Sequence, residues 1–133
     1  MPKNILYVED NRDAITFFNR VVTKLGDYQF MTSEDGASAI RLLEEKNDFE
    51  PEMILLDINL PGMNGFEILQ HVRTKTNYKH VPVIMFTSSD DDNDVKKSYE
   101  YGANAYLIKP DSLHTLKEVL ADTFNFWLKH NVA

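Results

Sequence analysis

Three apolar runs of the chain each end in polar residues that could bind a cation or a phosphoryl group. The runs and the residues that follow them are 5–8 before Glu9 and Asp10, 53–56 before Asp57, and 105–108 before Lys109. Apolar runs of this length, separated by helix-like segments, are typical of buried parallel strands. Ligands of such sheets bind beyond the carboxyl ends of the strands. The sequence therefore predicts three carboxylates and one ammonium at one sheet edge, which suits a divalent cation and a phosphoryl group.

The rest of the chain predicts the elements that would position these side chains. Strand and helix patterns alternate five times without a break in composition. The strands are expected near 5–8, 28–32, 53–58, 83–86 and 105–108, and the helices near 14–25, 36–43, 66–72, 91–101 and 111–127. Such alternation predicts right-handed crossovers and a doubly wound α/β sheet with helices on both faces. The helix at 91–101 is the weakest, because Val95 and Tyr99 are almost its only apolar anchors.

Bulk composition narrows the class of protein. The chain has 133 residues, of which 43% are hydrophobic and 26% charged, as expected of one globular domain. Its net charge of −7 argues against direct nucleic-acid binding, which needs a basic face. No apolar run approaches the roughly 18 residues of a membrane span, and no secretory signal opens the chain. The absence of cysteine fits a reducing compartment, so we expect a cytoplasmic protein that does not contact membranes.

Some of the strand-end residues also have an ordinary structural explanation. Asp10 could cap the first helix with Asp13 as its partner, and Thr87 is a residue type that strands favour. Lys109 alone would more often be a solvated lysine. Asp57 is harder to explain in this way, because a carboxylate that continues four apolar residues is costly to desolvate unless a positive charge balances it.

Taken together, the strand-end residues resemble the receiver domain of two-component response regulators. The resemblance rests on Glu9-Asp10, Asp57, Thr87 and Lys109-Pro110, which lie in order at the ends of four strands. It covers residues 3–128, which leaves 129–133 as a short C-terminal tail and implies no output domain. It implies a flavodoxin-like five-stranded parallel sheet of order 2-1-3-4-5 with five helices. Within the family, the chain is similar to stand-alone CheY-like regulators, including those paired with phytochrome kinases.

The resemblance implies a role for each position. Asp57 would be the phosphoacceptor, and Thr87 and Lys109 would contact the phosphoryl group. Mg²⁺, or Mn²⁺ in its place, would be bound by oxygen ligands, with Glu9 acting through water. The expected ligands are Asp10, Asp57 and the backbone carbonyl of Asn59.

Further roles concern switching and the lifetime of the phosphoryl group. Tyr106 would be a switch that turns inward when Thr87 moves. Asn59 and Ser89 lie where the family tunes the lifetime of the phosphoryl group. The resemblance also implies a cis peptide bond before Pro110.

The family reading implies a signalling protein and its partners. A sensor histidine kinase or a phosphotransfer protein would donate the phosphoryl group, and the chain would catalyse only its own phosphorylation and dephosphorylation. The switched surface would be the face of the fourth helix, fifth strand and fifth helix. An unidentified downstream protein, or a second copy of the chain in a homodimer, would bind this face.

Three other kinds of protein share part of this pattern. A haloacid-dehalogenase-type phosphatase would need an acid two residues after the nucleophile, where the chain has Asn59. A flavin module would need a phosphate-binding loop after the first strand, where Glu9 and Asp10 would repel a phosphate. A degenerate receiver that only binds partners stays open, although every expected catalytic position is filled.

Overall fold

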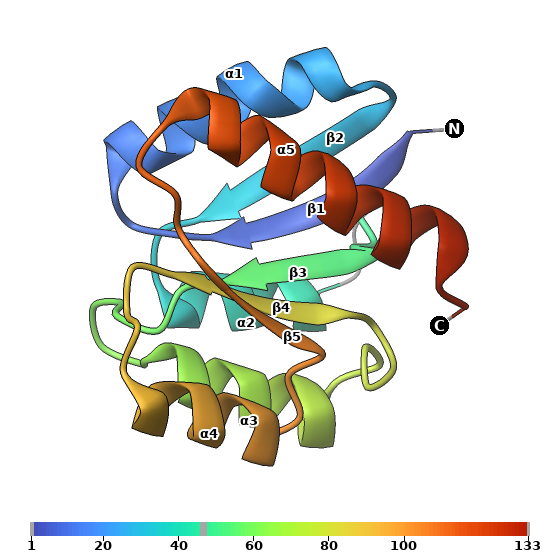
Figure 1. Ribbon diagram of the computed structural model, residues 1–133. Helices are drawn as coiled ribbons and strands as arrows, with labels where there is room; N and C mark the ends of the chain where they lie inside the picture. The colour runs from blue at the N-terminus through green and yellow to red at the C-terminus, as the bar shows by residue number, and fades with distance from the viewer. Residues whose placement is uncertain (1, 46–47, 133) are drawn as a thin grey trace.

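Five segments rich in apolar, β-branched and aromatic residues form one parallel sheet in the computed structural model, which describes residues 2–45 and 48–132 (Figure 1). The strands are β1 (Lys3–Val8), β2 (Tyr28–Ser33), β3 (Met53–Leu56), β4 (Val83–Thr87) and β5 (Ala105–Ile108). Their order is β2-β1-β3-β4-β5, and every neighbouring pair is parallel. The predicted flavodoxin-like fold and strand order are confirmed.

Helices cover both faces of the sheet, with α1 and α5 on one side and α2, α3 and α4 on the other (Figure 1). The helices are α1 (Arg12–Leu25), α2 (Gly36–Glu44), α3 (Gly65–Lys75), α4 (Asp92–Glu100), α5 (Leu113–Phe124) and the π-helix η1 (Asn125–His130). A polar side chain accepts a hydrogen bond from a backbone amide of the first turn of each α-helix. None of the helices within the described residues has both the length and the apolar character that a membrane span requires.

The core consists of two layers of side chains, one on each face of the sheet. Successive residues of a strand point to opposite faces. Ile5, Tyr7 and Leu55 therefore pack toward α1 and α5, whereas Leu6 and Leu56 pack toward α2 and α3. Because β1, β3 and β4 are buried on both faces, they appear in the sequence as uninterrupted apolar runs.

Three differences from the expected elements concern β3, the start of α1 and the last helix. β3 ends at Leu56 rather than at 58, so Asp57 lies immediately after the strand. Asn11 caps α1 instead of Asp10, because the Asn11 side chain accepts a hydrogen bond of 2.9 Å from the Ala14 amide. Asparagine and aspartate cap about equally well, so the sequence did not distinguish them. The last helix becomes a π-helix after Phe124, and it ends at His130, two residues beyond the expected domain boundary.

α4 has few apolar contacts, as predicted, and neither of its two expected anchors is fully buried, since Val95 is only half-buried. Tyr99 is 50% exposed, and the buried residue of the helix is Ser98. The Ser98 hydroxyl donates a hydrogen bond of 2.7 Å to the Asp94 carbonyl, which satisfies its polar group without apolar packing. α4 is therefore held less firmly than the strands beside it.

Gly65 provides a test of the packing between α3 and the loop after β3. A Cβ atom at Gly65 would clash with the Asp57 carbonyl and lie 2.8 Å from Ile58 Cα. Alanine would normally gain about 0.5–1 kcal/mol over glycine in a helix. We expect Gly65→Ala instead to lower the free energy of unfolding by about 3 kcal/mol, because both clashing groups are backbone. Urea titration followed by circular dichroism measures this loss.

Gly62 is the matched control for this substitution. Its φ of +72° disfavours alanine, but no atom lies within 4 Å of an added Cβ. Gly62→Ala should therefore cost only about 1 kcal/mol. Equal losses in the two variants would contradict a steric role for Gly65.

Candidate functional site

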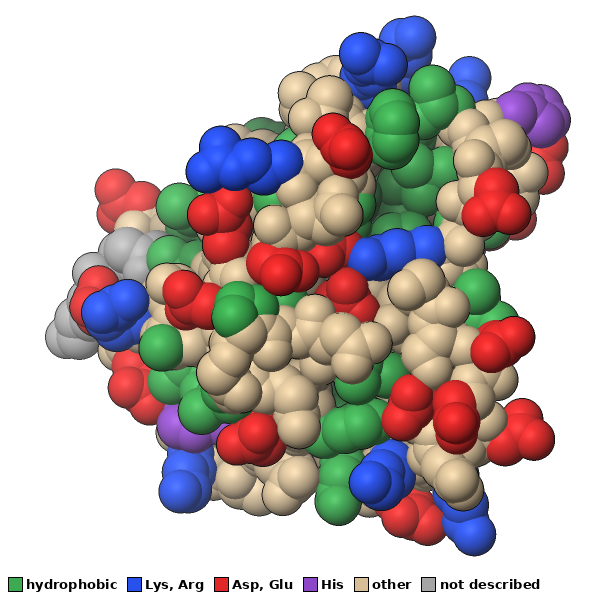
Figure 2. All heavy atoms as spheres, turned by 90° about the vertical axis from the view of Figure 1, so that its left-hand side faces the viewer, with side chains coloured by type: hydrophobic (Ala, Val, Ile, Leu, Met, Phe, Trp, Pro, Cys, Tyr) green, Lys and Arg blue, Asp and Glu red, His purple; other side chains and the backbone are tan. Residues whose placement is uncertain are grey.

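The carboxyl ends of β1, β3, β4 and β5 lie side by side at one edge of the sheet. This edge is the left-hand side of Figure 1, where the strand arrows end. The parallel register places Val8 beside Leu56 and Thr87 beside Ile108. Residues that follow these four positions therefore meet, although they are up to 100 positions apart in the chain. Figure 2 shows acidic side chains gathered with a basic one near the centre of this face.

Lys109 bridges two buried carboxylates at this edge. Its Nζ donates a hydrogen bond of 2.9 Å to Asp57 Oδ2 and another to Glu9 Oε1. The other oxygen of Asp57, Oδ1, accepts a hydrogen bond of 2.7 Å from the Ile58 amide. Asp57 is 6% exposed and Glu9 is 1% exposed. Of the predicted group of Glu9, Asp10, Asp57 and Lys109, the structure brings the side chains of Glu9, Asp57 and Lys109 together, and Glu9 contacts Lys109 directly.

Glu9 accepts hydrogen bonds from four donors. Its Oε1 accepts from Lys109 Nζ and, at 3.3 Å, from the Tyr7 hydroxyl. Its Oε2 accepts from the backbone amides of Asp10 at 3.1 Å and Asn11 at 3.3 Å, just before α1 begins. The sequence analysis did not predict the hydrogen bond between Tyr7 and Glu9. The available signal was a tyrosine two residues before a glutamate, which places both side chains on one face of a strand.

Burial and charge shift the pKa values of this network in opposite ways. Burial raises the pKa of Glu9 above its usual value, and the opposing pull of Lys109 is too weak to restore it. Burial acts to lower the pKa of Lys109, but its hydrogen bonds with Glu9 and Asp57 outweigh that effect and raise it. Burial, and then the charge of Glu9, raise the pKa of the Tyr7 phenol far above its usual value. Two carboxylates face a single ammonium here, so the formal charge of Glu9, Asp57 and Lys109 together is negative, which favours a cation at this edge.

Thr87, Ser89 and Tyr106 connect the site to α4. The fully buried Thr87 hydroxyl accepts a long hydrogen bond of 3.4 Å from the Ser89 amide. The Ser89 hydroxyl donates a hydrogen bond of 2.6 Å to Asp94 in α4. The Tyr106 hydroxyl donates a hydrogen bond of 2.8 Å to the Ser89 carbonyl. The partly buried Tyr106 is thus linked through the loop after β4 to both Thr87 and α4.

Two of the predicted metal ligands belong to exposed residues, although the backbone amide of Asp10 contacts Glu9. Asp10 and Asn59 are both exposed. Within residues 2–45 and 48–132, no three acidic or histidine side chains are grouped closely enough to hold a metal ion. In this arrangement the Lys109 ammonium lies between the two buried carboxylates that the prediction assigned to the cation.

The prediction of a cis peptide bond before Pro110 is wrong. The described part of the chain has no cis peptide bond, so the bond between Lys109 and Pro110 is trans. The trans form is favoured even before proline, by about 0.5–1 kcal/mol.

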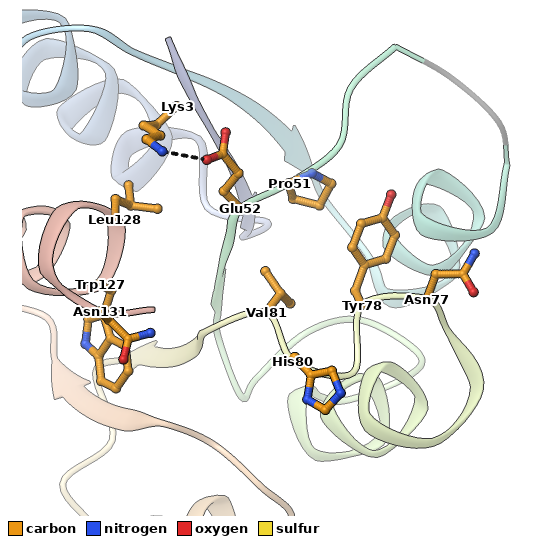
Figure 3. Close-up of a pocket in the computed structure, with 10 residues that line it drawn as sticks. All are labelled: Lys3, Pro51, Glu52, Asn77, Tyr78, His80, Val81, Trp127, Leu128 and Asn131. Atoms are coloured by element: carbon orange, nitrogen blue, oxygen red, sulfur yellow. Dashed lines mark ion pairs between the residues drawn. The ribbon is translucent and has the colours of Figure 1, made fainter. Parts of the chain in front are cut away.

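A cavity of about 380 Å³ lies at the opposite edge of the sheet (Figure 3). Lys3 and Glu52, near the amino ends of β1 and β3, form an ion pair of 3.1 Å at its border. Trp127 from η1 and Tyr78 from the loop before β4 contribute aromatic surface. None of the predicted site residues lines this cavity, so the chemistry of the strand-end residues belongs to the other edge.

Comparison with known proteins agrees with this fold. The family model of the response regulator receiver domain matches residues 5–121. The chain therefore belongs to the response regulator receiver domain family, a family of signalling proteins. Membership of this family decides against the two alternative classes, the haloacid-dehalogenase-type phosphatase and the flavin module.

Particular relatives narrow the resemblance further. The chain is 34% identical to the response regulator Rcp1 of Synechocystis sp. over 133 residues, which cover 96% of this chain and 90% of Rcp1. The crystal structure of the Mn²⁺-bound form of Rcp1 superposes with a TM-score of 0.86 at 32% identity and 98% coverage of both chains. The phosphorylated cyanobacterial phytochrome response regulator RcpA gives a TM-score of 0.90 at 28% identity, covering 99% of this chain and 98% of RcpA. The expected similarity to phytochrome-associated regulators is confirmed.

Replacing Lys109 tests whether it stabilises the two buried carboxylates. In Lys109→Met, Glu9 and Asp57 lose their common ammonium donor, so we expect the free energy of unfolding at neutral pH to fall by about 1.5–3 kcal/mol. The raised pKa of Glu9 means that its protonated form is the one that folding favours. The loss of unfolding free energy in Lys109→Met should therefore shrink as the pH falls through the pKa of Glu9 in the folded state. It should be smallest below the pKa of Glu9 in the unfolded state.

Urea unfolding of both proteins across this pH range measures the effect. Lys96→Met, on the exposed surface of α4, is the matched control and should change stability by less than about 0.5 kcal/mol. A Lys109→Met defect that does not change with pH would contradict the electrostatic explanation.

Proposed function

We propose that this chain accepts a phosphoryl group on Asp57 from a phosphohistidine of a sensor kinase or phosphotransfer protein. The observation that carries the proposal is the Lys109 ammonium 2.9 Å from the buried carboxylate of Asp57 at the carboxyl edge of a parallel sheet. Asp57 is the acidic residue directly after the central strand β3, where its backbone is held by a hydrogen bond to the Val8 carbonyl. Family membership supports the same role.

In the proposed reaction, an Asp57 carboxylate oxygen attacks the phosphorus atom of the donor. A P–O bond forms, the P–N bond breaks, and its electron pair passes to the donor imidazole, which takes up a proton. The product is an acyl phosphate on Asp57. Lys109 would turn from the carboxylates to the phosphoryl oxygens, and the Thr87 hydroxyl would donate a hydrogen bond to one of them. Water would later hydrolyse the acyl phosphate at a rate tuned by Asn59 and Ser89.

A divalent cation is part of this proposal, and the chemistry of the residues fits one. Carboxylate and carbonyl oxygens suit Mg²⁺ or Mn²⁺, and the negative formal charge of the site favours a cation. Asp10, Asp57 and the Asn59 carbonyl would hold the ion, with Glu9 acting through water. The bound ion would neutralise charge on the phosphoryl oxygens. The relative Rcp1 has a crystal structure in an Mn²⁺-bound form, which supports a divalent cation in this chain.

The signal would pass from Thr87 to the face of α4, β5 and α5. Thr87 is linked through Ser89 to Asp94 and Tyr106, so movement of its hydroxyl toward a phosphoryl oxygen would disturb these bonds. Tyr99, Ile108 and Leu113 expose apolar surface on this face. We propose that a downstream protein or a second copy of the chain binds there. A cytoplasmic location belongs to the same proposal.

Phosphorylation at Asp57 is tested by intact-protein mass spectrometry after incubation with acetyl phosphate. We expect one Mg²⁺-dependent phosphoryl adduct on the wild type and none on Asp57→Asn, because the amide is a poor nucleophile. Asp90→Asn, at an exposed position after β4, is the matched control and should retain the adduct. An adduct that persists on Asp57→Asn would reject this acceptor. A wild type that forms neither an adduct nor a beryllofluoride complex would favour the degenerate receiver.

The cation site is tested through Asp10. We expect Asp10→Asn to weaken Mn²⁺ binding by about tenfold or more, because the substitution removes a negative ligand at the edge of the site. Electron paramagnetic resonance of free Mn²⁺ measures the affinity without a phosphoryl donor. Asp92→Asn on α4 is the control and should bind Mn²⁺ as the wild type does. Unchanged affinity in Asp10→Asn would remove Asp10 from the ligand set.

A further inference from the structure

We propose that the Tyr7 hydroxyl is a positioning group that holds the Glu9 carboxylate in place for cation binding. Tyr7 lies in β1, with its ring in the core and its hydroxyl 3.3 Å from Glu9 Oε1. The inference deepens the proposed function and rests on it, because Glu9 acts there as a partner of the bound cation. Tyr7 would not touch the phosphoryl group or the ion and would act only through Glu9.

The Tyr7 ring is fixed on several sides. It is 1% exposed, and its centroid lies 4.2 Å from that of Phe18 in α1 and 6.2 Å from that of Phe86 in β4. Phe18 is in turn held edge-to-face by Phe30 at 4.9 Å. β1 is paired on both sides, with β2 and β3, so its backbone is equally constrained. The hydroxyl therefore has a set position, which is the property that a positioning group requires.

The four hydrogen-bond donors to Glu9 differ in how easily they can move away from its carboxylate. The amides of Asp10 and Asn11 belong to the backbone at the start of α1, and they hold only Oε2. Oε1 has two donors, Tyr7 and Lys109, and the Lys109 ammonium is carried on a flexible side chain. When Lys109 turns to a phosphoryl group, Tyr7 is the remaining donor to Oε1. Without it, one oxygen of a buried carboxylate would lose both protein donors, which is unfavourable.

Tyr7→Phe tests this role because it removes the hydroxyl and keeps the ring. Loss of a partner that orients a metal ligand typically costs 10- to 100-fold in metal affinity. Since the Tyr7 bond is long, we expect the lower end, about a tenfold weaker Mn²⁺ affinity by electron paramagnetic resonance. At saturating Mg²⁺, adduct formation with acetyl phosphate should return to within about twofold of the wild-type rate, because the hydroxyl does not contact the reacting atoms.

Two further variants separate positioning from packing. Tyr28→Phe is the matched control, because Tyr28 packs on Phe124 in the same core layer but lies at the amino end of β2, away from the site. Its Mn²⁺ affinity should equal that of the wild type. In a Glu9→Gln background, Tyr7→Phe should change the affinity by less than twofold, because the charge that the hydroxyl orients is gone.

The outcomes distinguish this inference from the proposed function. Wild-type affinity in Tyr7→Phe, or an equal loss in the Glu9→Gln background, would overturn the role of Tyr7. A wild type that binds Mn²⁺ but forms no adduct would contradict phosphorylation of Asp57 and leave the Tyr7 measurement valid. A wild type that binds no Mn²⁺ would overturn both the cation site and this inference. If Tyr7→Phe fails to fold, the wild-type Tyr7 hydroxyl proton offers a second test. Its NMR signal should stay protected from solvent exchange at saturating Mg²⁺, and loss of that protection would overturn the role.

Discussion

The burial of two carboxylates beside one ammonium is the constraint on which the rest of this structure depends. Glu9 and Asp57 are almost fully removed from water, and a buried charge is tolerated only where donors or opposite charges compensate it. Lys109 supplies the opposite charge to both carboxylates. Backbone amides complete the compensation at Ile58 and at the start of α1. These donors compensate the burial of the two carboxylates, so the site is stable in the folded protein. Its formal charge is still negative, which favours the binding of a cation.

This constraint explains why the elements around Asp57 are packed so closely. Asp57 must lie directly beyond a central strand, with α3 beginning only a few residues later. The Gly65 amide donates a hydrogen bond of 2.9 Å to the Ile58 carbonyl, and the missing Cβ of Gly65 lets α3 approach the Asp57 backbone. These contacts hold the loop after β3, and with it the carboxylate oxygens of Asp57, at set positions, which favours reactions that depend on positioning.

The two sides of the site differ in rigidity. Toward α1 and α5, Tyr7 and its aromatic neighbours form a closely packed core that fixes Glu9. Toward α4, the contacts are single hydrogen bonds through Ser89 to a helix whose only buried residue is Ser98. Added charge on Asp57 would therefore displace the residues on the α4 side rather than those toward α1 and α5. The α4 side has fewer apolar contacts, so less free energy is lost when it moves.

The sequence by itself determined the fold class, the strand order through its family resemblance, and the meeting of Asp57, Glu9 and Lys109 at one edge. It did so because apolar periodicity sets the strands and parallel strands bring their carboxyl ends together. It did not determine that Asn11 rather than Asp10 caps α1, or that Tyr99 is exposed, because those outcomes depend on local choices between similar residues and on packing. Only the tertiary structure decided that Lys109 bridges both carboxylates and that Tyr7 reaches Glu9. Hydrogen bonds between side chains depend on rotamers and depth of burial, and neither is encoded in spacing along the chain.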